Sequence, residues 1–261
     1  MIRRPRLVAA SAAVIAVLGL AAPSASASSP SPTAARLPAA AASNVSAYTY
    51  LKTHDGKLDS NWNNFSIATA LLRDLSGTSF KAHTGDLFSP RQKLTFFVPT
   101  DRALQVLLKQ VTGNTYATEA NVLNKLEQLL PQDVDALLGS GVVPGRTLSA
   151  SAVLASSGKN LVTEWGDRSL HVAVYGSGSR AIVSLWDQDH RLRNARVILA
   201  RTNLNPGNPQ ILHGVDRAVV GFHERMARSW FVNGEDSLSA TVHAGGCSPA
   251  LPCTGGSSGH G

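Results

Sequence analysis

Apolar side chains recur at helical spacing through the first half of the chain. They lie three or four residues apart in the segments 65–75, 104–111 and 122–138, a spacing that places them on one face of an amphipathic helix. Thr100 precedes the second segment and is a favourable N-cap residue, and Pro131 suits the first turn of a helix within the third. We therefore predict helices in all three segments, with a new helix starting at Pro131.

Patterns typical of β-strands follow a different period. A short apolar run at 94–98 ends at a proline and predicts a buried strand directly before the second helix. From 170 to 175 apolar and polar residues alternate, which indicates a half-buried strand, and further strands are predicted at 181–186, 192–202 and 211–220. A helical half followed by a meander of antiparallel strands predicts an α+β fold.

The N-terminus has the three-part pattern of a secretory signal peptide. Three arginines precede an apolar run at 7–22, and small residues suit cleavage after Ala27. The run is shorter than the ~20 residues of a membrane-spanning helix. We expect residues 1–27 to be removed, and the mature protein to be secreted, extracellular or cell-wall associated, with no transmembrane segment.

Segments of biased composition flank one body. Residues 28–46 are rich in Ala, Ser and Pro and predict a flexible linker. The body is expected to be a single domain at 47–224, followed by a C-terminal extension at 225–243 that packs on it. Residues 244–261 are rich in Gly and Ser and predict a flexible tail.

Both cysteines lie in this tail. Cys247 and Cys253 are close in sequence, and in an exported protein we expect them to form a disulfide. The stretch Leu-Pro-Cys-Thr-Gly at 251–255 is similar to the LPxTG signal by which sortases attach proteins to a cell wall. The six residues after it include neither an apolar run nor a basic end, so covalent anchoring is not expected.

The composition, 43% hydrophobic and 16% charged, is typical of a globular protein. The formal net charge is +7, and three of the positive charges lie in the expected signal peptide. The remaining charge is too small to indicate a nucleic-acid partner. Two cysteines exclude a disulfide-stapled miniature fold and a four-thiolate zinc site. Arg outnumbers Lys by 17 to 7, which indicates a GC-rich bacterial source.

Two signatures resemble those of the fasciclin-type (FAS1) domain. The first is LTFFVPTDRAL at 94–104, whose matching positions are Thr95, Phe97, Pro99, Thr100, Asp101 and Ala103. The second is ILHGVDRAVV at 211–220, in which His213 and Asp216 stand three residues apart among aliphatic residues.

A third motif, VVPG at 142–145, lies between them and is similar to the family's central motif. The chain differs from the family at Ser140-Gly141, where Tyr-His is common, so no binding role is carried over to that dipeptide. The resemblance implies a secreted protein of bacterial type. Its expected fold has antiparallel sheets in a wedge or sandwich and a helical layer from the N-terminal half.

The motif residues are expected to be structural. The first motif reads as a strand-to-helix junction in which Thr100 or Asp101 accepts a hydrogen bond from a helix-start amide. His213 and Asp216, three apart in a predicted strand, would point to opposite faces. That arrangement disfavours a shared catalytic or metal role, and both residues are interpreted as hydrogen-bonding residues of the fold.

No catalytic or cofactor pattern is evident. The chain has no Gly-x-Ser-x-Gly, His-Glu-x-x-His or P-loop motif. The glycines at 176–181 lie between two predicted strands and are interpreted as a hairpin turn, and the acidic run at 187–190 as a polar turn. The eight histidines show no metal-ligand spacing. We expect no enzymatic activity, no cofactor and no metal.

Arginine and tryptophan supply the candidate binding residues. Arg193 and Arg196 lie on the predicted strand 192–202 and Arg191 directly precedes it. The three are candidates for holding an anionic polymer, with a solvated sheet face as the alternative. Trp165 and Trp186 are predicted to end adjacent strands, where they either flank a sugar-binding surface or pack at the rim of the core.

The resemblance to FAS1 implies a non-enzymatic adhesion or binding module. Its expected partner is a polysaccharide or protein of the cell surface or matrix, with anionic envelope polysaccharide as the first candidate. A secreted hydrolase, favoured by a deep pocket with a perturbed His or carboxylate, is one alternative. An envelope protein–protein interaction factor, favoured by a contiguous exposed apolar patch, is another. The oligomeric state is left open.

Overall fold

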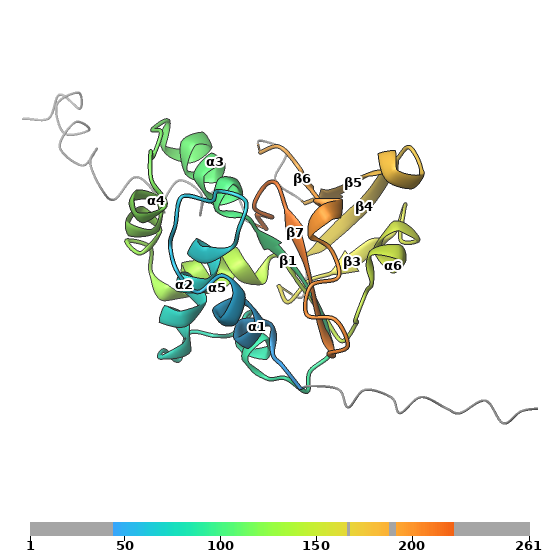
Figure 1. Ribbon diagram of the computed structural model, residues 1–261, viewed down its shortest axis with the longest axis horizontal. Coiled ribbons are helices and arrows are strands. Elements are labelled where there is room, and N and C mark those ends of the chain that lie inside the picture. The colour runs from blue at the N-terminus through green and yellow to red at the C-terminus, as the bar shows by residue number, and fades with distance from the viewer. Residues whose placement is uncertain (1–43, 166–167, 188–191, 222–261) are drawn as a thin grey trace, which may run out of the picture. The chain divides into compact units, whose positions relative to one another are not determined.

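A computed structural model describes residues 44–165, 168–187 and 192–221 (Figure 1). The expected signal peptide, the segments 225–243 and 244–261 with their cysteines, and Arg191 lie outside the described residues. Within them, no helix is both long enough and apolar enough to span a bilayer.

The helices are α1 (Ala47–His54), α2 (Ser66–Ser76), α3 (Asp101–Thr112), α4 (Glu119–Leu126), α5 (Pro131–Gly139) and α6 (Ala150–Leu154). The strands are β1 (Leu94–Pro99), β2 (Val142–Pro144), β3 (Asn160–Val162), β4 (Ser169–Tyr175), β5 (Ile182–Trp186), β6 (Ala195–Arg196) and β7 (Gln210–Val215). Short 3-10 helices lie at Gly85–Phe88, Gly178–Arg180 and Leu199–Arg201.

The α+β class is confirmed, and the strands form two sheets. One has the order β2-β1-β7, with β1 antiparallel to β2 and parallel to β7. The other has the order β3-β4-β5-β6 and is antiparallel throughout. The predicted antiparallel meander therefore ends at β6, because β7 joins the other sheet beside β1.

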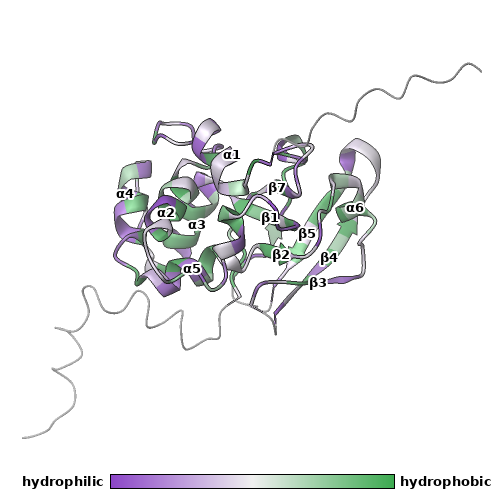
Figure 2. Cartoon of the chain, turned by 90° about the horizontal axis from the view of Figure 1, so that it is seen from below, coloured by the Kyte–Doolittle hydropathy of each residue, from purple (hydrophilic) through white to green (hydrophobic). Residues whose placement is uncertain are grey.

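Alternation along β1 explains why the sheets and helices form layers. Leu94, Phe96 and Val98 belong to the core shared with α2, α3, α4 and α5, whereas Phe97 belongs to a second core shared with β3, β4 and β5. Successive strand residues face opposite sides, so the β2-β1-β7 sheet lies between the helices and the second sheet (Figure 1). Figure 2 shows the hydrophobic residues along these strands.

The predicted helix boundaries hold where local capping determines them. Thr100 is the N-cap of α3 and its side chain accepts a hydrogen bond from the Ala103 amide, while Thr118 has the same role for α4. Gly113 ends α3 with a φ of 75°, a conformation that favours glycine. Pro131 begins α5, as predicted.

Two predicted strands are shorter than expected. The segment 192–202 contains only β6 and a 3-10 helix, because the chain there crosses from one sheet to the other: Val197 donates its amide to Val183, and Ile198 donates to Gly214. The segment 211–220 contains β7, which stops at Val215.

The ordered body begins earlier than the sequence suggested. The Val45 amide donates to Asn208 Oδ1 at 2.9 Å, and the Ser46 side chain caps α1. Ser46 is also buried. The predicted linker at 28–46 therefore overlaps the body at its C-terminal end.

Candidate functional site

The first motif forms the predicted strand-to-helix junction. Thr95 Oγ1 donates to the Arg146 carbonyl and accepts from the Leu148 amide, both at 2.8 Å. The Thr100 hydroxyl accepts from the Ala103 amide at 3.2 Å. These bonds are internal to the body, so the two threonines hold β1, α3 and the 145–148 segment together.

Asp101 caps a different helix from the one it begins. Its Oδ1 accepts from the Ile67 amide at 2.8 Å, and its Oδ2 accepts from the Ser66 amide at 3.2 Å and the Ser66 hydroxyl at 2.8 Å. The α2 N-cap, Phe65, offers no side-chain acceptor. Asp101 therefore satisfies the free amides of α2 from 35 residues away. Burial raises the pKa of Asp101 to about 7, although these hydrogen bonds oppose the rise.

His213 and Asp216 have separate partners. The His213 ring is fully buried, its Nε2 lies 2.7 Å from the Leu148 carbonyl, and its Nδ1 lies 3.4 Å from the Asn203 amide. Desolvation lowers its pKa, so the ring is neutral, with Nε2 donating and Nδ1 accepting. Asp216 lies beyond the end of β7, where its Oδ1 accepts from the Arg196 amide at 2.8 Å. The two residues share no site.

The β3-β4-β5-β6 sheet has one buried and one open face. Leu170 and Val172 of β4 and Val183 and Leu185 of β5 are buried in the second core. The alternate residues of these strands face away from it. The name outer face is used here for the residues Val162, His171, Ala173, Tyr175, Ile182, Ser184, Trp186 and Arg196.

Large apolar side chains are exposed on the outer face. Tyr175 is 51% exposed, Ile182 45%, Trp186 43% and Val162 55%. In the described part of the chain, seven large hydrophobic residues are exposed. Four of them lie on this face, on the adjacent strands β3, β4 and β5. Exposed apolar side chains gathered on one face of a sheet mark a binding site more often than single exposed side chains do.

The strand register places large side chains at two ends of this face. The His171–Trp186 pair forms one end, with ring centroids 5.8 Å apart, and Tyr175–Ile182 forms the other. His171 and Tyr175 are four positions apart along β4, which corresponds to about 13 Å between the two pairs.

Small residues lie between these two ends, and Ser184 among them is buried. Ala173 pairs with Ser184, which in turn pairs with Arg196 at the sheet edge. Aromatic rings, small residues and a guanidinium group thus share one face, an arrangement that suits an extended ligand with anionic groups.

The arginines of the sequence do not all gather there. Arg193 and Arg196 are exposed, whereas Arg201 lies over the Phe65 ring at 5.8 Å. Arg217 lies 3.7 Å from Asp216, whose carboxylate also contacts the Arg196 backbone. Of the three candidate anion-binding residues, Arg196 has a defined place on the outer face and Arg191 lies outside the described residues.

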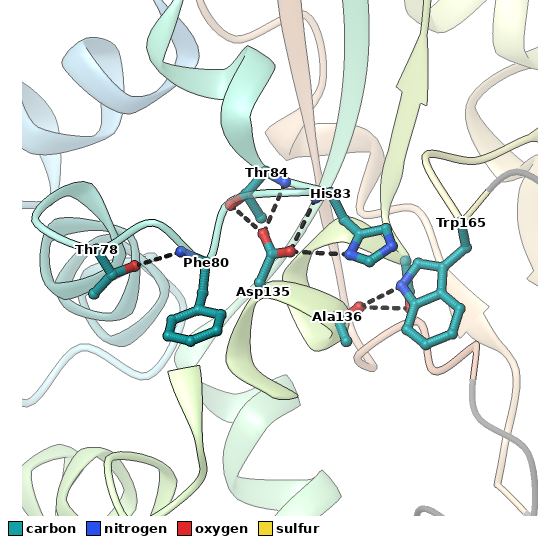
Figure 3. A network of polar contacts seen from close by, with 8 residues as sticks. Thr78, Phe80, His83, Thr84, Asp135, Ala136 and Trp165 are labelled. Carbon is teal, nitrogen blue, oxygen red and sulfur yellow. Dashed lines mark hydrogen bonds and ion pairs between the residues drawn. The ribbon is translucent and has the colours of Figure 1, made fainter. Parts of the chain in front are cut away.

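Trp165 lies apart from Trp186, although both were predicted to end adjacent strands. Trp165 follows β3 in a turn, and its Nε1 donates to the Ala136 carbonyl of α5 at 3.1 Å. Its ring stacks on His83, with centroids 4.9 Å apart and planes inclined by 17° (Figure 3). Trp165 therefore packs at the rim of the helical core, which is the second of the two alternatives.

Asp135 organises this second cluster, which sequence reasoning missed. Its carboxylate accepts from the backbone amides of His83 and Thr84, both at 2.9 Å, from His83 Nδ1 at 2.9 Å and from the Thr84 hydroxyl (Figure 3). The available signal in the sequence was a single carboxylate within the apolar run 134–138. His83 and Thr84 supply all four hydrogen bonds that the Asp135 carboxylate accepts. Asp135 therefore fixes the end of the 78–84 segment to α5.

An apolar groove of about 300 Å³ lies between α2 and the start of α5. Its lining residues are Leu71, Asp74, Leu75, Thr78, Glu127, Leu129, Pro131 and Val134. The strongly shifted Asp101 and the buried His213 are not among them. No group of three His, Cys, Asp or Glu residues in the described ranges is placed to hold a metal ion.

Comparisons with known proteins show similarity to solved structures alone. No family model matches the chain, and no curated protein matches it. Among solved structures, the chain is similar to a FAS1 domain pair from the insect cell adhesion molecule fasciclin I, at 16% identity and a TM-score of 0.34. The similarity covers 67% of this chain and 44% of that one, so the chain spans less than half of its length.

Proposed function

We propose that the protein is a secreted, non-enzymatic adhesion module that binds an anionic polysaccharide of the cell surface or matrix through the outer face. The proposal rests on one observation: exposed Trp186 and Tyr175 lie on a sheet face that also carries Arg196. Aromatic rings present flat apolar surfaces to sugar rings. A guanidinium group binds carboxylate or phosphate. The sequence motifs that resemble FAS1 support a binding role.

A protein partner is the second candidate, and the same surface favours it. Val162 and Ile182 are exposed aliphatic residues that extend the apolar part of the outer face. Such residues contribute to protein interfaces. A protein partner would depend on them, whereas a polysaccharide would depend on the aromatic and arginine residues.

Co-sedimentation tests the polysaccharide proposal. The chain from Ser28 onward is incubated with insoluble polygalacturonate, an anionic polymer, and with cellulose, a neutral one. We expect binding to the anionic polymer that weakens at high salt, because Arg196 is exposed to solvent. Replacements W186A and R196S should each weaken binding about tenfold, a loss of ~1.4 kcal/mol.

Matched variants separate the outer face from general surface effects. F80A removes a ring that is 49% exposed in the helical half, and R91S removes an exposed arginine before β1. Both should bind like the unaltered chain. Equal binding by all four variants, or equal binding to both polymers, would exclude this surface as an anionic-polysaccharide site. Loss of binding to whole cells in V162S and I182S alone would favour the protein partner.

A further inference from the structure

Two buried carboxyl groups meet at one hydroxyl in the helical layer. Ser66 Oγ lies 2.8 Å from Asp101 Oδ2 and 3.3 Å from Glu119 Oε2, and the three residues are each at most 2% exposed. A serine hydroxyl has a single proton. It can donate to one carboxyl group only, and it must face the other with a lone pair.

The remaining contacts do not compensate for two negative charges. Glu119 Oε2 accepts from the Asp59 amide at 2.7 Å, but Glu119 Oε1 is buried and has no hydrogen-bond partner. The Asp101 oxygens accept only from Ser66 and Ile67. An ionised Glu119 would thus hold a buried charge on an oxygen with no donor, which is costly.

Charged groups from the neighbouring elements do not neutralise the pair. The 55–65 segment contributes Asp59, whose carboxylate adds negative charge. From α3, Arg102 directs its guanidinium group to Gln105 Oε1 at 2.6 Å and lies over the Trp62 ring at 5.1 Å. The first turn of α2 carries no charged residue, and the acidic residue in the first turn of α4 is Glu119 itself.

One added proton supplies the donor that is missing between Ser66 and the two carboxyl groups. If either carboxyl is protonated, it donates to Ser66 Oγ, and the hydroxyl then donates to the other carboxylate. This gives a continuous chain of hydrogen bonds between α4, α2 and α3. Burial, with a smaller contribution from the Glu119 charge, raises the pKa of Asp101 to about 7, in agreement with this geometry.

We propose that Asp101 and Glu119 share one proton in the folded protein below neutral pH, and that this proton is a latch which joins α2, α3 and α4 and is released in mildly alkaline solution. The latch belongs to the helical layer and does not depend on any ligand of the outer face. Its loss places two negative charges beside Ser66 and weakens the attachment of α4 and the Asp59 segment to α2.

The proton has a definite effect on stability. The folded pair takes up a proton near pH 7, whereas an unfolded aspartate does so near its model value of 3.8. The stabilisation is complete below pH 3.8 and is lost as the pH rises to about 7. Within this window the folded protein binds up to one proton more than the unfolded chain, so the unfolding equilibrium constant rises by up to about tenfold for each unit of pH increase.

The variant E119Q provides the test, because glutamine keeps the size of the side chain and can donate to Ser66 without a negative charge. Chemical unfolding of the full chain is measured from pH 5 to pH 8.5 for the unaltered protein, E119Q and E127Q. Glu127 is an exposed carboxylate at the end of α4 and serves as the matched control.

The unfolding constant of the unaltered protein should rise relative to that of E119Q between pH 5 and pH 7, and E127Q should follow the unaltered protein. Taking the ratio removes the contribution of other titrating groups, His213 among them. The infrared band of a protonated carboxyl group should be present at pH 6 in the unaltered protein and E127Q. In E119Q it should disappear at a lower pH than in the unaltered protein, because the Glu119 charge no longer raises the pKa of Asp101.

A ratio that is constant with pH would overturn the proposal. So would a protonated-carboxyl band that is missing from the unaltered protein at pH 6 or that disappears at the same pH in E119Q as in the unaltered protein. The infrared measurement on the unaltered protein decides the matter even where E119Q does not fold.

Discussion

The side-chain amide of Gln210 lies against the backbone of Ala47, with Oε1 2.6 Å from the amide nitrogen although 163 residues separate the two. The Gln210 Nε2 group donates to the carbonyls of Asp86 and Ser89, at 2.7 Å and 2.5 Å. Gln210 is fully buried at the start of β7. One side chain thus joins α1, the 3-10 helix before β1 and the last strand.

Replacing Gln210 by alanine should destabilise the body strongly. Q210A leaves a buried amide and two carbonyls without their partner, so we expect a loss of about 2–4 kcal/mol, since each unsatisfied buried group costs about 1–3 kcal/mol. Urea unfolding measures this loss. Q92A, at an exposed position before β1, is the control and should change the unfolding free energy by less than about 0.5 kcal/mol. A loss below about 1 kcal/mol for Q210A would contradict the bridging role.

His213 should make the protein less stable in acid. Burial lowers the pKa of this imidazole below 6.5, so the folded state keeps it neutral while the unfolded chain takes up a proton. Its stabilisation is present above pH 6.5 and is lost as the pH falls towards the folded-state pKa. Acidification from pH 7.5 to pH 5 should therefore cost the unaltered protein more unfolding free energy than H213Q. Equal losses in both proteins would show that His213 does not titrate on unfolding.

The Thr100 cap should contribute a measurable part of the stability. T100A removes the acceptor of the Ala103 amide at the start of α3, and loss of an N-cap costs about 1 kcal/mol, within a range of about 0.5–2. Thermal unfolding of T100A and of T115A, an exposed threonine that caps no helix, provides the comparison. The idea fails if both variants melt at the same temperature.

Gly139 should tolerate no side chain. A Cβ atom at this position would lie 2.2 Å from His83 Cβ and 3.1 Å from the His83 carbonyl oxygen. G139A must therefore displace the loop that Asp135 holds, and we expect a loss of about 1–3 kcal/mol, as for other overpacked sites. In G85A the new Cβ would meet only Lys81 Cβ, at 3.9 Å, an ordinary contact. If the two variants were equally stable, the close packing of α5 on His83 would be refuted.

Local features of the fold could be predicted from the sequence. The α3 helix begins at Thr100 and ends at Gly113 because both signals act within a few residues. The cap of α2 could not be found in this way, because its acceptor is Asp101 on another helix, 35 residues later. The parallel pairing of β7 with β1 could not be predicted from the sequence either, because the apolar pattern of a strand does not specify its neighbour.

The candidate site was predictable only where local alternation determines which way a side chain faces. Alternation along 170–175 indicated which residues of that strand face outward, and Arg196 was identified as a candidate. The sequence left open whether Trp165 and Trp186 flank one surface, because only tertiary packing decides that Trp165 stacks on His83 of a distant loop. Asp135 carries no motif, and its importance follows from four hydrogen bonds to residues about 50 positions earlier.

The parallel pairing of β1 with β7 also constrains the order of folding. Thr100 at the end of β1 bonds Val215 at the end of β7, 115 residues later. The β3-β4-β5 hairpins can form from neighbouring residues, but the central sheet must close a loop that contains nearly the whole second half of the body. Contacts this distant slow folding, because the entropy of loop closure is lost before the contacts form. During synthesis, β1 must therefore remain without its parallel neighbour until almost the entire body has emerged.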